Sequence, residues 1–186
     1  MQGLLFCCVI CYYNVYISTK RGLLMNSIAE HTPIGWCKVS EDSGYVTEVK
    51  YIDGTIDFEQ RPTELLCKAK QQLDEYFEGT RKIFELPIKA EGSEFSKAVL
   101  SQLAKIPYGQ TVSYGQLAAL CGYPRAARAV GTAMRKNPVA IILPCHRVVQ
   151  AGGKLGSYSA GGEANKDWLL TFEKQNSTPM LPLFML

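Results

Sequence analysis

The sequence predicts a mixed α+β fold, in which a small strand-rich α/β domain precedes a domain built around a helix-turn-helix. Three observations support this prediction. Residues 27–58 are rich in β-branched and aromatic residues and are broken by glycine turns, as strands are. The segment after residue 62 repeats its apolar residues with a helical period. Two short helical segments then flank a glycine-containing turn near residue 122.

The composition is that of an ordinary globular protein. The chain has 186 residues, of which 47% are hydrophobic and 20% charged, enough for one large domain or two small ones with a sizeable core. Its seven cysteines lack the regular spacing of a disulfide framework. We therefore expect reduced thiols in an intracellular protein, cytoplasmic or nuclear depending on the organism.

Residues 1–24 are interpreted as an apolar extension of the first domain. A mis-assigned start is one explanation of this extension, since Met25 stands just before the first domain-like segment. The uncharged run 4–17 is shorter than the ~20 residues of a membrane span and lacks the basic residues that open a secretory signal. Cys8 and Cys11 form a C-x-x-C, but one pair alone gives no zinc site. A membrane-anchoring tail is the alternative.

The first predicted elements are strands within residues 27–58. Turns are expected at Gly35, at Ser43-Gly44 and at Asp53-Gly54, because glycine and short polar residues mark turns between strands. These turns divide the segment into hairpin-like pieces. The sequence therefore predicts a small sheet at the start of the N-terminal domain.

A helix follows the strands. Pro62 is predicted to open it and Gly79 to end it. Its apolar positions are Leu65, Leu66, Ala69, Leu73, Tyr76 and Phe77. The segment LPIKAEGS then marks a boundary, so we expect an N-terminal α/β domain over residues 25–91.

The second half is predicted to be helical and to form one domain over residues 92–176, followed by a tail at 177–186. A first helix carries Phe95, Val99 and Leu103 on one face, and residues 106–109 form a turn. Ser113 and Gln116 form a capping box that starts the next helix.

The second helix of the predicted helix-turn-helix is strongly basic. Gly122 breaks the preceding helix, Pro124 suits the first turn of the next, and Asn137-Pro138 ends it near Lys136. This helix is expected to carry Arg125, Arg128, Arg135 and Lys136. From Phe95 to Gly162 there is no acidic residue and the net charge is +8, which leaves −5 on the rest of the chain. This segregation favours a polyanion-binding half, with a solvated basic face as the alternative.

Cys145 and His146 form the strongest candidate for chemistry. A cysteine reacts as its thiolate, His146 can act as its base, and Arg147 supplies a fixed positive charge nearby. Because neighbours in an extended segment point to opposite faces, the pair needs a turn or a bridging water. Glu173, Glu163 and Asp167 are all candidates to orient the histidine.

The chain resembles the methylated-DNA–protein-cysteine methyltransferases, which repair O6-alkylguanine. The matching segments are IPYGQTVSYGQLAALCGYPRAARAVGTAMRKNP, LPCHRVV, GSYSAGG and WLLTFE, with weaker similarity in HTPIGW and QLDEYFEGTRKIFELPI. The Pro-Cys-His-Arg core is highly specific, and the resemblance covers about residues 28–174. It implies an RNase H-like N-terminal domain and a winged-helix-like C-terminal domain that carries the active site.

The resemblance also implies roles for single residues. Cys145 is then the alkyl acceptor, His146 its base through a water and Glu173 the group that orients the histidine. Asn137 holds the helix-turn-helix against the cysteine segment. Residues expected to bind the base or the DNA are Tyr114, Arg125, Arg128, Arg135, Tyr158 and Ser159. Tyr114 contacts the extruded purine, Arg128 fills its place in the stack, and the reaction occurs once per molecule.

Some features depart from the family pattern. Leu100 stands where relatives often have tryptophan, and YSAGG is one residue longer than the usual Tyr-Ser-Gly-Gly, with Ala160 as the extra residue. The zinc ligands of some relatives have no counterpart, so no metal or cofactor is expected. The partner implied is double-stranded DNA that contains O6-alkylguanine, O4-alkylthymine being a further candidate substrate, and we expect a monomer.

Two other functions compete with alkyl transfer. A non-enzymatic alkyl-lesion sensor or a helix-turn-helix regulator would bind DNA without chemistry, but such sensors lack the cysteine. A thiol hydrolase would use a Cys-His pair, but it would need no acid-free DNA-binding helix and would turn over.

Overall fold

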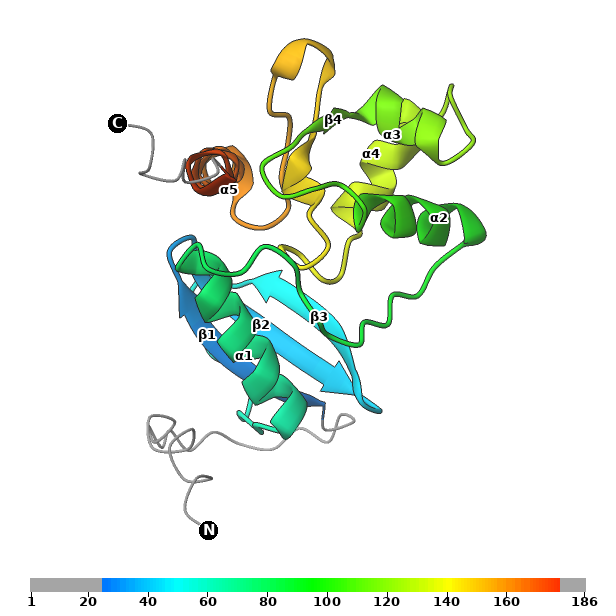
Figure 1. Ribbon diagram of the computed structural model, residues 1–186. Coiled ribbons are helices and arrows are strands. Elements are labelled where there is room, and N and C mark those ends of the chain that lie inside the picture. Colours follow the sequence, from blue (N-terminus) through cyan, green and yellow to red (C-terminus); the bar gives the residue numbers. More distant parts are fainter. Residues whose placement is uncertain (1–24, 178–186) are drawn as a thin grey trace, which may run out of the picture.

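A computed structural model describes residues 25–177 and shows the predicted order of a strand-rich part followed by a helical part (Figure 1). The expectations for residues 1–24, including Cys8 and Cys11, lie outside the described residues, as does nearly all of the expected tail. The helical part begins with α2 and ends with α5, which runs over Gly162–Ser177. The predicted mixed α+β fold is confirmed.

The N-terminal part is a three-stranded antiparallel sheet covered by one helix. Strands β1 (Asn26–Thr32), β2 (Gly35–Asp42) and β3 (Tyr45–Tyr51) follow one another in space as in sequence. The turn between β2 and β3 consists of Ser43 and Gly44, both with positive φ, as a tight hairpin turn requires. Ile28 lies directly opposite Val39, and both are buried beneath the helix.

Helix α1 (Glu64–Phe77) packs on this sheet through one face (Figure 1). Its fully buried side chains include Leu66, Leu73 and Tyr76. Burying each leucine contributes about 1.5–3 kcal/mol relative to leaving it exposed. The helix starts two residues later than predicted, because the Thr63 hydroxyl accepts the Leu66 N–H and so makes Thr63 the cap.

The helical part begins with α2 (Glu94–Leu103), which Ser93 caps. Helix α3 (Tyr114–Leu120) starts at the predicted capping box, since the Ser113 hydroxyl accepts the Gln116 N–H and the Gln116 side chain accepts the Ser113 N–H. Two short strands, β4 (Val112–Ser113) and β5 (Val148–Val149), pair in parallel beside it.

Helix α4 (Ala127–Arg135) corrects the prediction for the second helix of the pair. It begins at Ala127, so Pro124 and Arg125 lie in the turn before it and not in its first turn. The cap at Ala126 makes no side-chain hydrogen bond. Arg128 and Arg135 remain on the helix, and both are exposed. The basic surface is therefore shared between the turn and the helix.

Backbone hydrogen bonds join the two parts next to the cysteine segment. The Val49 N–H of β3 donates to the Pro138 carbonyl over 2.8 Å, and the Ala140 N–H donates back to the Val49 carbonyl over 3.0 Å. The Asn165 side chain of α5 also donates to the Ile34 carbonyl. The sheet of the N-terminal part thus supports the chain that leads to Cys145.

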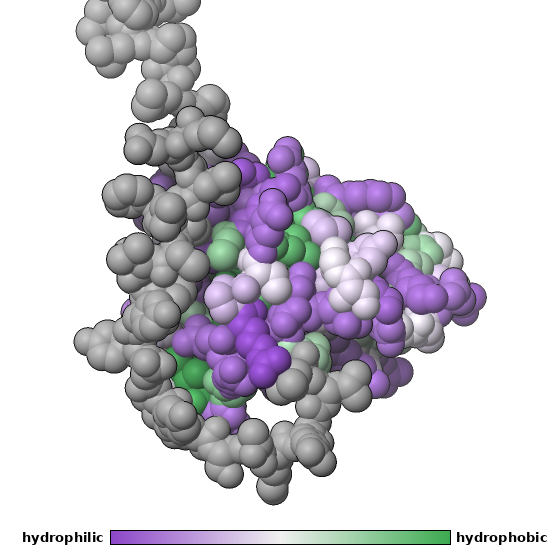
Figure 2. Space-filling model, turned by 90° about the horizontal axis from the view of Figure 1, so that it is seen from below, coloured by the Kyte–Doolittle hydropathy of each residue, from purple (hydrophilic) through white to green (hydrophobic). Residues whose placement is uncertain are grey.

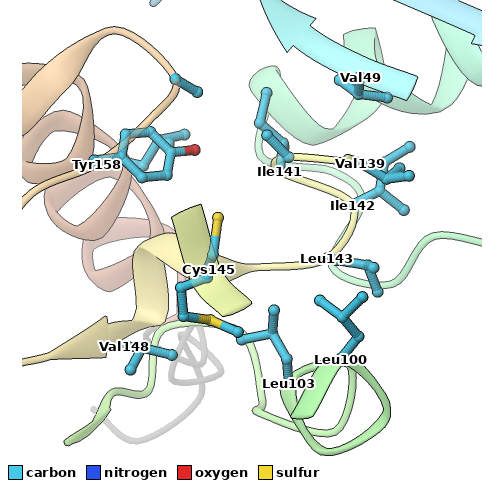
Figure 3. Packing of buried hydrophobic residues seen from close by; sticks show 14 of the residues in the cluster. Val49, Leu100, Leu103, Val139, Ile141, Ile142, Leu143, Cys145, Val148 and Tyr158 are labelled. Atoms are coloured by element: carbon cyan, nitrogen blue, oxygen red, sulfur yellow. The ribbon is translucent and has the colours of Figure 1, made fainter. Parts of the chain in front are cut away.

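A continuous hydrophobic core crosses this junction. Val49 from the sheet lies near Val139 and Ile141 of the connecting loop, and Ile141 and Tyr158 lie closer to Cys145 (Figure 3). The surface seen from below Figure 1 is mostly hydrophilic, with only small separate apolar patches where described residues are visible (Figure 2). None of the helices between residues 25 and 177 is long and apolar enough to cross a bilayer.

Candidate active site

Cys145 lies at the start of a 3-10 turn, Cys145–Arg147, that follows Pro144. The turn supplies the bend that the paired roles of Cys145 and His146 require. Both side chains are buried, Cys145 with 5% and His146 with 0% of its surface exposed. Ile141, just before the turn, has a φ of 71°, which is strained for a β-branched residue and shows how tightly the loop is held.

Asn137 fixes the cysteine to the end of α4. Its side-chain amide donates to the Leu143 carbonyl over 2.8 Å and to the Cys145 sulfur over 3.2 Å. Its side-chain oxygen accepts the Val139 N–H over 3.1 Å. Because all of these contacts are buried, the side chain holds both the loop and the thiol in place.

His146 is oriented by Glu173, on α5, and not by the other two candidates. The His146 Nε2 and the Glu173 Oε1 are 2.8 Å apart, and neither side chain is exposed. Glu163 and Asp167 lie on the exposed side of the same helix. Because an ionised carboxylate only accepts, Nε2 carries the proton and Nδ1 is the basic atom. Nδ1 is buried and has no partner within residues 25–177.

Glu173 receives five hydrogen bonds from four residues. On Oε1 they come from Tyr76 Oη at 2.7 Å, His146 Nε2 at 2.8 Å and an Arg147 nitrogen at 2.8 Å. On Oε2 they come from Arg147 Nε at 2.9 Å and the Gly109 N–H at 3.0 Å. Arg147 was expected to act on the thiol. Instead its guanidinium forms a two-pronged pair with this carboxylate.

These contacts determine the charge states of the acid and the base. Burial alone would raise the pKa of Glu173, but hydrogen bonds from His146 and Arg147 and the positive charge of Arg147 hold its pKa well below the usual range. Burial lowers the pKa of His146, and Glu173 opposes this only in part. The resting pair is therefore a neutral imidazole beside a carboxylate anion.

Cys145 rests as a neutral thiol. Burial raises the pKa of its thiol, while the hydrogen bond from Asn137 and the positive charge of Lys166 act in the opposite direction. A buried thiol of this kind needs a base at the moment of reaction. His146 is next in the chain, and its buried Nδ1 has no partner within the described residues.

Lys166 is a site residue that the sequence analysis missed. It is 1% exposed, and its Nζ donates to the Val148 carbonyl over 2.6 Å. Burial lowers the pKa of Lys166, and the negative charge of Glu163, together with that of Cys145 once its thiol ionises, opposes the shift. Its ammonium also lies 5.8 Å from the centre of the Tyr114 ring. A buried cation at this place favours the thiolate.

The expected base-binding residues lie around the thiol to different degrees. Tyr158 is buried, and burial followed by the charge of Cys145 raises its pKa well above the usual value. Tyr114, the first residue of α3, has its pKa raised by the same two causes. Ser159 is exposed, whereas its neighbour Ala160 is buried. The Tyr158 ring centre lies 6.4 Å from that of His146, Tyr114 lies beside the Lys166 ammonium, and Ser159 faces outward.

Tyr76 and Gly109 were also missed as site residues. The sequence predicts Tyr76 as an apolar position of its helix, because nothing in the neighbouring residues indicates a hydrogen-bond partner for its hydroxyl. Gly109 was read only as part of a turn. It has a φ of 72°, and a Cβ there would lie 2.6 Å from the Ser177 Cβ, so a side chain would push α5 and Glu173 away. The positive-φ turn is the signal that identifies such a glycine.

Lowering the pH from 7 toward 5 is expected to destabilise the protein through His146. Because its pKa is lowered by folding, only the unfolded chain binds this proton below about pH 6.5. The free energy of unfolding should therefore fall as the pH drops through this range, by up to about 1.4 kcal/mol per pH unit. Urea unfolding at several pH values measures this slope.

The His146→Asn variant should show a flatter slope over the same range. A substitution at His31, which is exposed on β1 and does not contact Glu173, controls for the loss of a histidine. Equal slopes in the wild type and His146→Asn would contradict the assignment of a neutral, buried His146.

Metal binding has no support in the described residues. From Met25 to Ser177, no group of three or more histidine, cysteine, aspartate or glutamate side chains is arranged to hold a metal ion.

Two family models match the chain. One describes the ribonuclease-like domain of 6-O-methylguanine DNA methyltransferase and matches residues 12–90. The other describes the DNA-binding domain of that protein and matches residues 94–175. The methylated-DNA–protein-cysteine methyltransferase of Methanosarcina acetivorans is 40% identical over 147 residues, covering 76% of this chain and 94% of its own.

Solved structures are similar over the same region. The O6-methylguanine methyltransferase of Mycobacterium tuberculosis matches with a TM-score of 0.77 and 36% identity, covering 87% of this chain and 99% of that one. A structure from the same organism in complex with DNA matches with a TM-score of 0.72 and 38% identity, covering 82% and 93%. The similarity therefore includes both the sheet and the helix-turn-helix.

Proposed function

The chain belongs to the methylated-DNA–protein-cysteine methyltransferase family, whose members repair DNA by alkyl transfer, and we propose that Cys145 is the acceptor and O6-alkylguanine the substrate. Two buried hydrogen bonds support this proposal, one from Asn137 to the Cys145 sulfur and one between His146 and Glu173. In this proposal these contacts hold a thiol, its base and the carboxylate that orients the base.

The transfer is a single displacement. His146 Nδ1 takes the thiol proton through a water, and the sulfur attacks the alkyl carbon. The S–C bond forms as the bond from that carbon to O6 breaks, and the proton passes to the departing guanine. The product is a stable thioether, so each molecule reacts once and needs no cofactor. Lys166 and Asn137 stabilise the sulfur as its charge develops.

Access to O6 requires extrusion of the nucleotide, because the atom is covered inside the base stack. We assign Tyr114 and Tyr158, whose rings lie next to Lys166 and His146, as the side chains that receive the purine. In this proposal the Tyr114 hydroxyl donates to the purine and improves guanine as the leaving group. We assign Ser159, which is exposed next to Tyr158, to a contact with the extruded base at the surface.

The DNA partner is bound by α4 and the turn before it. Small residues Ala127, Ala129 and Gly131 surround Arg128, so the helix can approach a groove closely while the exposed arginine projects. Arg125 and Arg135 are exposed on the same basic region and suit phosphate contacts. We assign Arg128 to the gap that the extruded nucleotide leaves.

Several finer expectations belong to the same proposal. The two domains meet at residues 91–92, a division supported by the ranges of the two family matches and by the Ser93 cap of α2. A monomer suffices, because every group named for the chemistry comes from one chain. A reducing, intracellular compartment fits the free thiols of Cys37, Cys121 and Cys145.

Arg128→Ala is expected to slow repair of duplex DNA and to leave reaction with a free base unchanged. Without the arginine, the extruded state loses its stacking compensation, which is on the order of 1–3 kcal/mol, or about 5- to 150-fold in rate. O6-benzylguanine needs no extrusion. Single-turnover transfer at saturating duplex, repeated with this free base, measures both effects.

Arg135→Ala is the matched control on the same helix. A phosphate contact predicts weaker binding and a salt dependence reduced by about one unit, with the rate at saturating DNA preserved. Equal slowing of Arg128→Ala on duplex and free base would show instead that Arg128 supports the fold or the pocket.

A further inference from the structure

One hydrogen bond connects the N-terminal helix directly to the active site. Tyr76, on α1, donates from its hydroxyl to Glu173 Oε1 over 2.7 Å, across 97 positions of the chain. The Tyr76 side chain is fully buried. All other groups named so far in the chemistry lie C-terminal to residue 108, so this contact is a contribution of the other domain.

We propose that Tyr76 is a positioning residue for alkyl transfer, which acts by holding the Glu173 carboxylate that orients His146. This inference rests on the proposed role of His146 as the base. Three groups donate to Oε1: the Tyr76 hydroxyl, the His146 imidazole and the Arg147 guanidinium. Tyr76 is the one that takes no part in proton transfer and carries no charge. Its short contact fixes where Oε1 lies, and hence where the imidazole must sit to reach it.

The surroundings of Tyr76 favour a role at this one point. Its ring packs among Phe77, Phe84, Tyr108 and Phe172, which fixes the hydroxyl in direction. The Arg147 guanidinium donates to both carboxylate oxygens, whereas the Tyr76 hydroxyl donates to Oε1, the oxygen that His146 also contacts. Tyr76 withdraws charge from Oε1 and limits how strongly Glu173 attracts the His146 proton.

Tyr76→Phe isolates this contact, because it removes the hydroxyl and keeps the ring. We expect about tenfold slower transfer from O6-benzylguanine, the effect of losing one hydrogen bond to a charged group. The rate constant is taken from the time course, and the end point counts the reactive protein. Misfolded protein therefore lowers the end point and leaves the rate constant unaffected.

The pH dependence of the transfer rate should also change. Its acid limb, the pH range in which protonation of His146 slows transfer, should move. With one donor fewer, Oε1 stabilises a charged His146 more strongly, so the limb should shift to higher pH. The other groups that act on His146 are Arg147 on its own turn and Lys166 on α5, and neither is altered by the substitution. A purely structural role for Tyr76 would leave this limb where it is in the wild type.

Tyr108→Phe is the matched control. The ring centres of Tyr108 and Tyr76 are 5.9 Å apart, but the buried Tyr108 hydroxyl has no hydrogen-bond partner within the described chain. Burial raises the pKa of Tyr108 to about 12, so it is also a neutral phenol. Removing this hydroxyl should leave both the rate and its pH dependence unchanged.

The double variant Tyr76→Phe/His146→Asn separates the inference from the proposed function. If Tyr76 acts through His146, the substitution should slow the wild type but not His146→Asn. Wild-type rate and acid limb in Tyr76→Phe, or an equal further slowing of His146→Asn, would overturn the inference. A wild-type rate in His146→Asn alone would instead overturn the proposed role of the base.

Discussion

Cys145→Ser is expected to abolish alkyl transfer and to leave DNA binding intact. A serine hydroxyl is ionised far less readily than a thiol, so the rate should fall on the order of a thousandfold or more. The side chain is of similar size, and the Asn137 amide can donate to the new oxygen as it does to sulfur. The exposed basic residues of α4 are unaffected. Label transfer and fluorescence anisotropy with duplex DNA measure the two properties.

Cys121→Ser is the matched control for this prediction. Cys121 is also a free thiol of the helical part, and its sulfur donates to the Ala98 carbonyl over 3.8 Å. It takes no part in the proposed chemistry, so transfer should proceed at the wild-type rate. Label on Cys121 or Cys37 in the wild type, or full transfer by Cys145→Ser, would contradict the assignment of Cys145.

Glu173→Gln is expected to be strongly destabilising. The carboxylate is fully buried and neutralises the buried Arg147 guanidinium at 2.8 and 2.9 Å. Glutamine removes this charge and places an amide donor opposite groups that are themselves donors. Breaking one partner of a buried pair costs about 3–5 kcal/mol, a large part of the total stability of a domain. Urea unfolding at neutral pH measures the loss.

Asp167→Asn is the control for the same helix. Asp167 is exposed, so loss of its charge should change stability by no more than about 0.5 kcal/mol. If Glu173→Gln were as stable as Asp167→Asn, the Arg147–Glu173 pair would not support the fold. A folded Glu173→Gln with a wild-type rate would show that His146 does not need this carboxylate.

Local patterns were sufficient to predict the elements that local interactions determine. The Ser113–Gln116 capping box is a contact over three residues, and it is found as predicted. The hairpin turn at Ser43-Gly44 likewise follows from the backbone preferences of its own residues. The start of α4 was placed too early because Pro124 is equally suited to the turn that precedes a helix, and nothing nearby distinguishes the two positions.

The site was predicted only as far as adjacent residues and the family resemblance allowed. Cys145 and His146 are neighbours in sequence, so their pairing was visible there. The contact from Tyr76 to Glu173 spans 97 positions, and a tyrosine on an apolar helix face looks the same whether or not its hydroxyl has a partner. Lys166 was missed for a similar reason, since a lysine in a helix normally faces solvent.

The most direct test is the intact mass of the protein after incubation with an excess of duplex DNA that contains O6-methylguanine. If Cys145 accepts one methyl group irreversibly, the wild type should gain the mass of one methyl in place of one hydrogen. The gain should lie on the peptide that contains Cys145, and Cys145→Ser should gain nothing in parallel. An unchanged wild-type mass would indicate a sensor or regulator. Repaired DNA in excess of the protein would indicate turnover, and either result would contradict a single-use alkyl acceptor.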